Sequence, residues 1–139
     1  MGGMNTHTPL FIEESHGYRI EVRTHFDFPR SNPMQGQFLF EYTVTITNMN
    51  GVEAQLLKRT WHIEDGNSEV RQVHGPGVIG YTPFFKLKEK FNYSSFCPLQ
   101  TMTGRMWGHF EMLSSKGEAF EITTPVFKFS VPEDFIDRY

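Results

Sequence analysis

The chain has 139 residues, the length of one domain with a single core, and its formal net charge is −3. Its charged residues are dispersed rather than gathered into a basic patch or stripe, so we expect no nucleic-acid partner. No apolar run is long enough to span a bilayer and no secretory signal peptide is recognised, so we expect a cytoplasmic protein with no membrane partner. Cys97 is the only cysteine, which excludes an internal disulfide and fits a reducing compartment.

Residues 1–16 have little regular period and predict a mobile N-terminal arm. Within it, Gly2 and Thr6 match the N-myristoylation template, but no polybasic cluster follows to supply a second anchoring signal. The alternatives for Gly2 are therefore lipidation and an added leader before Met4.

From Tyr18 the sequence alternates apolar and polar residues with the period of a half-buried strand. A loop rich in Pro, Ser, Asn and Gly follows and leads into the strongest alternation of the chain. The five apolar members of that second strand are expected at the centre of the core: Phe38, Phe40, Tyr42, Val44 and Ile46.

Further along the chain, Asp65-Gly66-Asn67 is typical of a hairpin turn between two strands. The first of these strands is expected to place Leu57, Arg59, Trp61 and Ile63 on one face. More short alternating runs follow up to Val131, and no helix is predicted. This spacing predicts an all-β fold, an immunoglobulin/fibronectin III-like β-sandwich with two sheets and about seven to eight strands. The sandwich is expected over residues 17–132, followed by a C-terminal tail at 133–139; a small barrel is the alternative.

The segment from His74 to Tyr81 is the first candidate site, because it contains the spacing Gly-x-Gly-x-x-Gly. Dinucleotide-binding turns need those glycines between a strand and a helix, whose N-terminus holds the pyrophosphate. Pro83 follows closely and no helix is predicted there, so we interpret the glycines as a loop shaped by close approach or positive φ. As a predicted recognition loop it comprises His74, Gly75, Gly77, Val78, Ile79, Gly80 and Tyr81.

Candidate chemistry elsewhere is sparse. His62 and His74 could face each other across the hairpin, but two ligands do not make a metal site, so no metal and no cofactor are predicted. Cys97 alternates with apolar neighbours and is expected in the core rather than as a nucleophile, and no catalytic residue is proposed. Arg59 has two interpretations: it satisfies backbone carbonyls beneath an aromatic ring, or it contacts an anion together with His74.

The chain resembles the ApaG family through a series of motifs in order. They are residues 55–63 (QLLKRTWHI), 73–80 (VHGPGVIG), 91–99 (FNYSSFCPL), 104–108 (GRMWG) and 125–127 (PVF). The resemblance covers about Tyr18 to Pro132 and implies a fibronectin-type sandwich. It also implies a genetic link to cobalt resistance and magnesium efflux in bacteria, and a protein-interaction role where the domain occurs in eukaryotic proteins. It carries over no catalytic residue.

Three functions follow as expectations. A non-catalytic module that binds an unidentified protein partner is favoured, since Gly-rich loops on a rigid sandwich suit recognition. The alternatives are a phosphate or polyphosphate binder using Arg59, His74 and loop amides, and an accessory role in divalent-metal homeostasis. A monomer or a weak homo-oligomer is expected.

Overall fold

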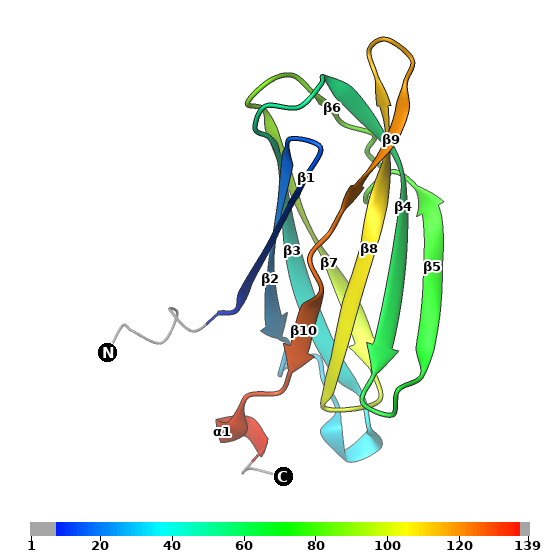
Figure 1. The fold of residues 1–139 in the computed structure, drawn as a ribbon. Coiled ribbons are helices and arrows are strands. Elements are labelled where there is room, and N and C mark those ends of the chain that lie inside the picture. The colour runs from blue at the N-terminus through cyan, green and yellow to red at the C-terminus, as the bar shows by residue number, and fades with distance from the viewer. Residues whose placement is uncertain (1–7, 137–139) are drawn as a thin grey trace, which may run out of the picture.

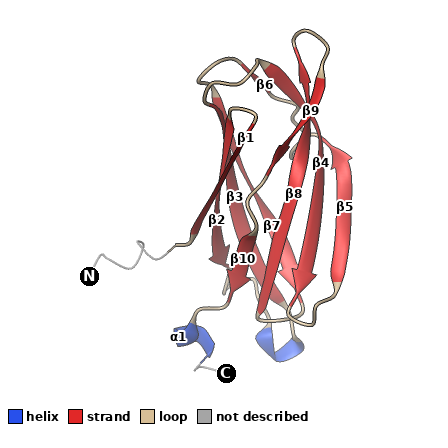
Figure 2. Cartoon of the chain, in the orientation of Figure 1, coloured by secondary structure: helices blue, strands red, loops and turns tan. Residues whose placement is uncertain are grey.

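The computed structural model describes residues 8–136 and confirms an all-β sandwich of two antiparallel sheets (Figures 1 and 2). The first sheet has the order β1-β2-β3-β7, formed by Leu10–Ser15, Tyr18–Phe26, Phe38–Asn48 and Lys90–Leu99. The second has the order β10-β8-β4-β5, formed by Phe127–Ser130, Thr103–Ser114, Ala54–Asp65 and Val70–Pro76. In addition, β6 (Phe84–Phe85) pairs with β4, and β9 (Ala119–Thr123) pairs with β8.

Helical structure in the described chain is limited to a short 3-10 turn, Pro33–Gln35, and to α1, Glu133–Ile136. Neither is long or apolar enough to cross a membrane, and no other helix occurs in residues 8–136. The architecture is therefore fixed almost entirely by strand pairing and by packing between the two sheets.

Strand β3 lies at the centre of the first sheet, paired with β2 on one side and β7 on the other. Its inward residues alternate with half-buried ones as the sequence predicts, and Val44 and Ile46 are fully buried. Phe40 stacks on Phe129 of the facing sheet with ring centroids 5.0 Å apart. Each such side chain stabilises the fold by about 1.5–3 kcal/mol through burial, so this strand anchors the core.

Strand β4 contains a β-bulge that corrects the predicted face. The register with β8 shifts between Leu56 and Lys58, so Leu56 is buried and Leu57 is only partly covered. A bulge inserts one residue and reverses the alternation on one side of it, which a simple period-two reading cannot detect. Beyond the bulge, Trp61 and Ile63 are buried as predicted.

The predicted arm over residues 1–16 is wrong from Leu10 onward, because Leu10–Ser15 forms β1 and pairs with β2. The turn between them has positive φ at His16 (52°) and Gly17 (79°), as a two-residue hairpin requires. Leu10 and Ile12 remain exposed and only Phe11 packs against the core, so the strand is held mainly by its backbone hydrogen bonds. An alternation of apolar and polar residues arises where one face of a strand is buried. Most side chains of β1 are exposed, so its sequence shows no such alternation. Residues 1–7, with Gly2, lie outside the described residues.

The C-terminal tail is likewise shorter than predicted. Phe135, on α1, packs against Phe26 and Phe28, with ring centroids 5.7 and 4.9 Å away. The ten strands described exceed the predicted seven to eight, because β1 and the two-residue β6 were not foreseen.

Candidate functional site

One side of the sandwich is open. Figure 1 shows β5 at the outer edge of its sheet, on the side away from β1 and β10, and β7 is the edge strand of the other sheet on that side. A pocket of about 240 Å³ lies between the two sheets there, and we call it the inter-sheet pocket. Its floor consists of buried side chains and its rim of exposed ones. The lining comprises Tyr42, Arg59, Trp61, Ile63, Arg71, Val73, Ile79, Tyr93, Ser95, Phe96, Cys97, Pro98 and Met106.

Two arginines enter this pocket from neighbouring strands. Arg59 of β4 donates from Nη1 to the carbonyl oxygens of Pro76 (2.9 Å) and Gly77 (3.1 Å). Arg71 of β5 donates from Nη2 to the carbonyl oxygen of Pro98 at 3.0 Å, which links the two sheets. Their remaining guanidinium nitrogens have no hydrogen-bond partner among the described residues, and no described carboxylate forms an ion pair with either side chain. Within the inter-sheet pocket itself, the two guanidinium groups therefore have no acidic neighbour among the lining residues.

Tyr93 presents a hydroxyl with an unusual environment. The side chain is 94% buried, and its hydroxyl oxygen is the one buried polar side-chain atom without a partner in residues 8–136. Burial raises the pKa of Tyr93 well above its usual value and Tyr42 raises it further, while the nearby Arg59 charge opposes the rise. A buried donor without a partner costs about 1–3 kcal/mol, so the hydroxyl calls for an explanation.

A second, wider hollow of about 910 Å³ adjoins the pocket at the β2–β3 end of the sandwich and shares Ile63, Arg71 and Pro98 with it. Arg30 lines this hollow and lies over the Phe96 ring, 4.9 Å from its centroid.

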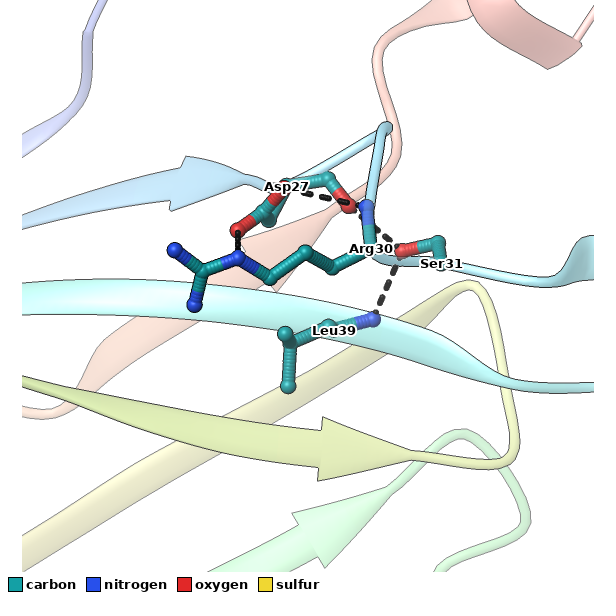
Figure 3. A network of polar contacts seen from close by, with 4 residues as sticks. All are labelled: Asp27, Arg30, Ser31 and Leu39. Carbon is teal, nitrogen blue, oxygen red and sulfur yellow. Dashed lines mark hydrogen bonds and ion pairs between the residues drawn. The ribbon is translucent and has the colours of Figure 1, made fainter.

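Figure 3 shows how the β2–β3 loop fixes Arg30. The Asp27 carboxylate accepts a hydrogen bond from the Arg30 amide (3.2 Å) and forms an ion pair with its guanidinium (3.4 Å). The Ser31 hydroxyl donates to the Asp27 carbonyl (2.7 Å) and accepts from the Leu39 amide (2.9 Å). Asp27 forms an ion pair with Arg30, and the hollow is also lined by Arg71, Asp65 and Glu69.

The predicted recognition loop forms a tight turn beside the pocket. Val78 and Tyr81 exchange two backbone hydrogen bonds of 2.8 and 2.9 Å, and the two residues between them have positive φ, 42° at Ile79 and 86° at Gly80. Positive φ is a genuine outlier for a β-branched residue such as Ile79. Val78 is fully buried and plugs the core, whereas Ile79 and Tyr81 are 52% and 58% exposed. Val78 thus belongs to the core, whereas Ile79 and Tyr81 form an exposed apolar surface of the loop.

The structure separates the two residues predicted to share an anion. His74 pairs with Thr60 in the β4–β5 register and accepts or donates through Nδ1 to its hydroxyl at 2.8 Å, on the outer face of the sheet. Arg59 points to the opposite face, into the pocket. Gly75 lies against the Arg59 guanidinium, where a Cβ atom would come within 3.1 Å of it. The hydrogen bonds to backbone carbonyls agree with the first interpretation of Arg59, whereas its contact with an anion stays a prediction in which His74 has no part.

Arg71, Tyr93 and Ser95 are site residues that the sequence analysis missed. The available signal was phase: Arg71 shares its strand face with Val73, so it was placed to point inward.

The candidate metal-binding and nucleophilic side chains lie as follows. No group of three or more His, Cys, Asp or Glu side chains in residues 8–136 is placed to hold a metal ion. Cys97 is buried as predicted, and burial raises the pKa of its thiol to about 11, with Arg71 opposing the rise. The Thr60–His74 pair is joined by no ion pair to a described carboxylate that would orient the imidazole.

The fold and site define a small antiparallel β-sandwich with a polar pocket at one open side. Residues 29–114 match the family model of the ApaG domain, and the chain belongs to this family. It is 39% identical to the ApaG protein of Mesorhizobium japonicum and 42% identical to that of Agrobacterium fabrum, each over 81% of this chain and 87% of the relative. The crystal structure of an ApaA protein from Bordetella pertussis superposes with a TM-score of 0.80 at 34% identity, covering 91% of this chain and 98% of that one.

Proposed function

We propose that this ApaG-family protein is a non-catalytic binding module that takes up an extended segment of a protein partner along the outer edge of β5. The observation that carries the proposal is the free backbone of this edge strand. A backbone hydrogen bond lies at each end of the β4–β5 ladder. The Asp65 amide donates to the Glu69 carbonyl oxygen at 3.0 Å, and the Gly77 amide donates to the Leu57 carbonyl oxygen at 2.8 Å. Because hydrogen-bonded pairs alternate along antiparallel strands, the backbone groups of Val70, Gln72 and His74 point away from β4.

Such an edge accepts a further strand, whose main chain supplies affinity while side-chain pockets supply specificity. Proteins usually protect a free edge with outward charges, short length or proline. In β5, seven residues long, Pro76 protects only the C-terminal end, and the one charged side chain, Arg71, lines the inter-sheet pocket instead of pointing outward. Val70 on β5 and Ile79 and Tyr81 in the loop that follows β5 are exposed apolar side chains that an incoming segment could contact. A buried free cysteine suits the reducing cytoplasm, where we place the interaction.

A proline scan of the edge tests this proposal. Gln72→Pro removes an N–H that points away from β4, so the β4–β5 ladder is kept and proline is tolerated there as on other edge strands. Gln72→Ala is the matched control, because it shortens the side chain and keeps the N–H. Affinity capture from lysate of the source organism, quantified for each variant, should recover one partner with wild type and Gln72→Ala and lose it with Gln72→Pro.

Circular dichroism and urea melts must show that Gln72→Pro is folded. Synthetic peptides that tile the captured partner then locate the bound segment. In isothermal titration with that peptide, wild type and Gln72→Ala should bind and Gln72→Pro should not. Equal binding by Gln72→Pro would refute the edge proposal. Concentration-dependent association of wild type alone, abolished in Gln72→Pro, would identify a second copy of this chain as the occupant instead.

A further inference from the structure

The inter-sheet pocket has the charge of an anion site. Arg59 and Arg71 each hold the main chain through one terminal nitrogen, which leaves the rest of each guanidinium available. None of the residues that line the pocket is acidic. Arg59 is half-buried, so its charge attracts an anion more strongly than it would in water, and Arg71 adds a second, exposed charge beside it.

The Tyr93 hydroxyl is an independent second observation. The Tyr93 side chain lines the same pocket and is nine-tenths buried, and its hydroxyl oxygen is itself buried with no partner among the described residues. The Ser95 hydroxyl and the Tyr42 ring come from the same wall. Buried donors in native proteins normally have a partner, so an oxygen-rich ligand accepting from Tyr93 would account for this one.

Volume restricts the ligand. At about 240 Å³, the pocket is smaller than the roughly 300–1,000 Å³ of sites for organic ligands. A nucleotide or a dinucleoside polyphosphate is therefore too large to be enclosed. A phosphate group carries about −1.5 to −2 charges and several acceptor oxygens, which matches two guanidinium groups and a hydroxyl better than a single carboxylate does.

We propose that the inter-sheet pocket binds one phosphate group between Arg59, Arg71 and the Tyr93 hydroxyl. This goes beyond the strand-edge function and does not depend on it. The phosphate comes either from the free ion or from a phosphorylated side chain on a bound segment. The exposed rim formed by Val73, Ile79 and Phe96 is open to both sources.

The test is an NMR titration of the full chain with inorganic phosphate, with acetate as the monoanion control. Phosphate should shift the amide signals of β5, β7 and the loop saturably, and acetate should do so more weakly. Arg71→Gln should weaken phosphate binding about tenfold or more, as expected for a lost charge-assisted hydrogen bond. Arg23→Gln is the matched control, since Arg23 is an exposed arginine of β2 outside the pocket, and it should bind like wild type.

Tyr93→Phe tests whether the Tyr93 hydroxyl binds a ligand or only fills space in the core. Loss of an unpartnered buried hydroxyl should leave stability unchanged or raise it, while phosphate binding weakens several-fold. This variant keeps the ring and the fold, so it decides the question even if Arg71→Gln unfolds. Wild-type affinity in Tyr93→Phe, absence of saturable shifts, or equal weakening by Arg23→Gln would each overturn the proposal.

A short Val/Thr-alternating peptide with a central phosphoserine, beside its serine counterpart, identifies the source of the phosphate. Tighter binding than inorganic phosphate, competed by free phosphate, assigns the group to a bound segment. Affinity no better than that of the ion assigns it to free phosphate. Both results support the site. If the edge variant Gln72→Pro binds no protein partner and still binds inorganic phosphate like wild type, the two proposals are distinguished.

Discussion

Two glycines in the His74–Tyr81 loop should respond very differently to alanine. Gly77 and Gly80 both have positive φ, at 58° and 86°. A left-handed conformation costs an L-residue about 1–2 kcal/mol, and this applies to both substitutions. At Gly77 the added Cβ would also overlap the Tyr81 carbonyl oxygen, whereas at Gly80 nothing lies within 4 Å of it.

The overlap at Gly77 sets the expected difference. Relieving it moves the Tyr81 carbonyl, which accepts the 2.8 Å hydrogen bond from Val78 and belongs to the pair that closes the turn. Each of those two bonds is worth about 1 kcal/mol net. We therefore expect Gly77→Ala to lower the unfolding free energy by about 3–4 kcal/mol and Gly80→Ala by about 1–2 kcal/mol.

Urea unfolding followed by tryptophan fluorescence measures both values, with equal m-values required for the comparison. Gly80→Ala should also keep the capture behaviour of wild type, because the loop retains its shape. Equal destabilisation by the two substitutions would show that the close approach of Gly77 to Tyr81 does not shape the loop, and that only the φ angles matter.

Three further predictions concern the core, the tail and pH. Trp61→Ala should lower the unfolding free energy by about 3–5 kcal/mol through the cavity it leaves, measured by urea melt; a loss below about 1 kcal/mol would contradict its burial. Phe135→Ala should cost about 1–2 kcal/mol, since its ring is only partly buried against the core; no loss would mean that α1 does not stabilise the fold. Burial raises the pKa of the Cys97 thiol from 9.0 to about 11, so its neutral form stabilises the folded state below pH 9, and this contribution is lost as pH rises from about 9 to 11. Melts across that window should show a smaller decline for Cys97→Ala than for wild type.

Alternation in the sequence was sufficient for the sandwich and for most of its core. Phe40, Tyr42 and Trp61 were placed in the core by phase alone, and all three are at most 5% exposed. Phase failed at Leu57, because the β4 bulge shifts the register there. It also failed for β1, whose side chains are mostly exposed, so that only the backbone ladder defines the strand.

The candidate site was predicted only in part, for a different reason. Arg59 was singled out because it shares a face with Trp61, but its partner was taken to be His74, which is close in sequence to the glycines. Strand register places His74 opposite Thr60 on the outer face and places Arg71 in the pocket. Tyr93 comes from the other sheet, and nothing local in the sequence links residues on facing sheets.

The two lateral sides of the sandwich, at β10 and at β5, differ in the side chains between the sheets, and this contrast bears on function. On the side of β10, Phe129 stacks on Phe40 and tilts against Tyr42, with centroids 5.0 and 6.4 Å apart, and aromatic packing seals the core. On the side of β5, the inward positions carry Arg59 and Arg71, and a pocket remains. An apolar side chain in place of Arg59 would bury more surface and avoid the cost of partly desolvating its charge. Departures from local patterning are expected mainly at functional sites, which is why we propose the β5 side as the binding side of this fold.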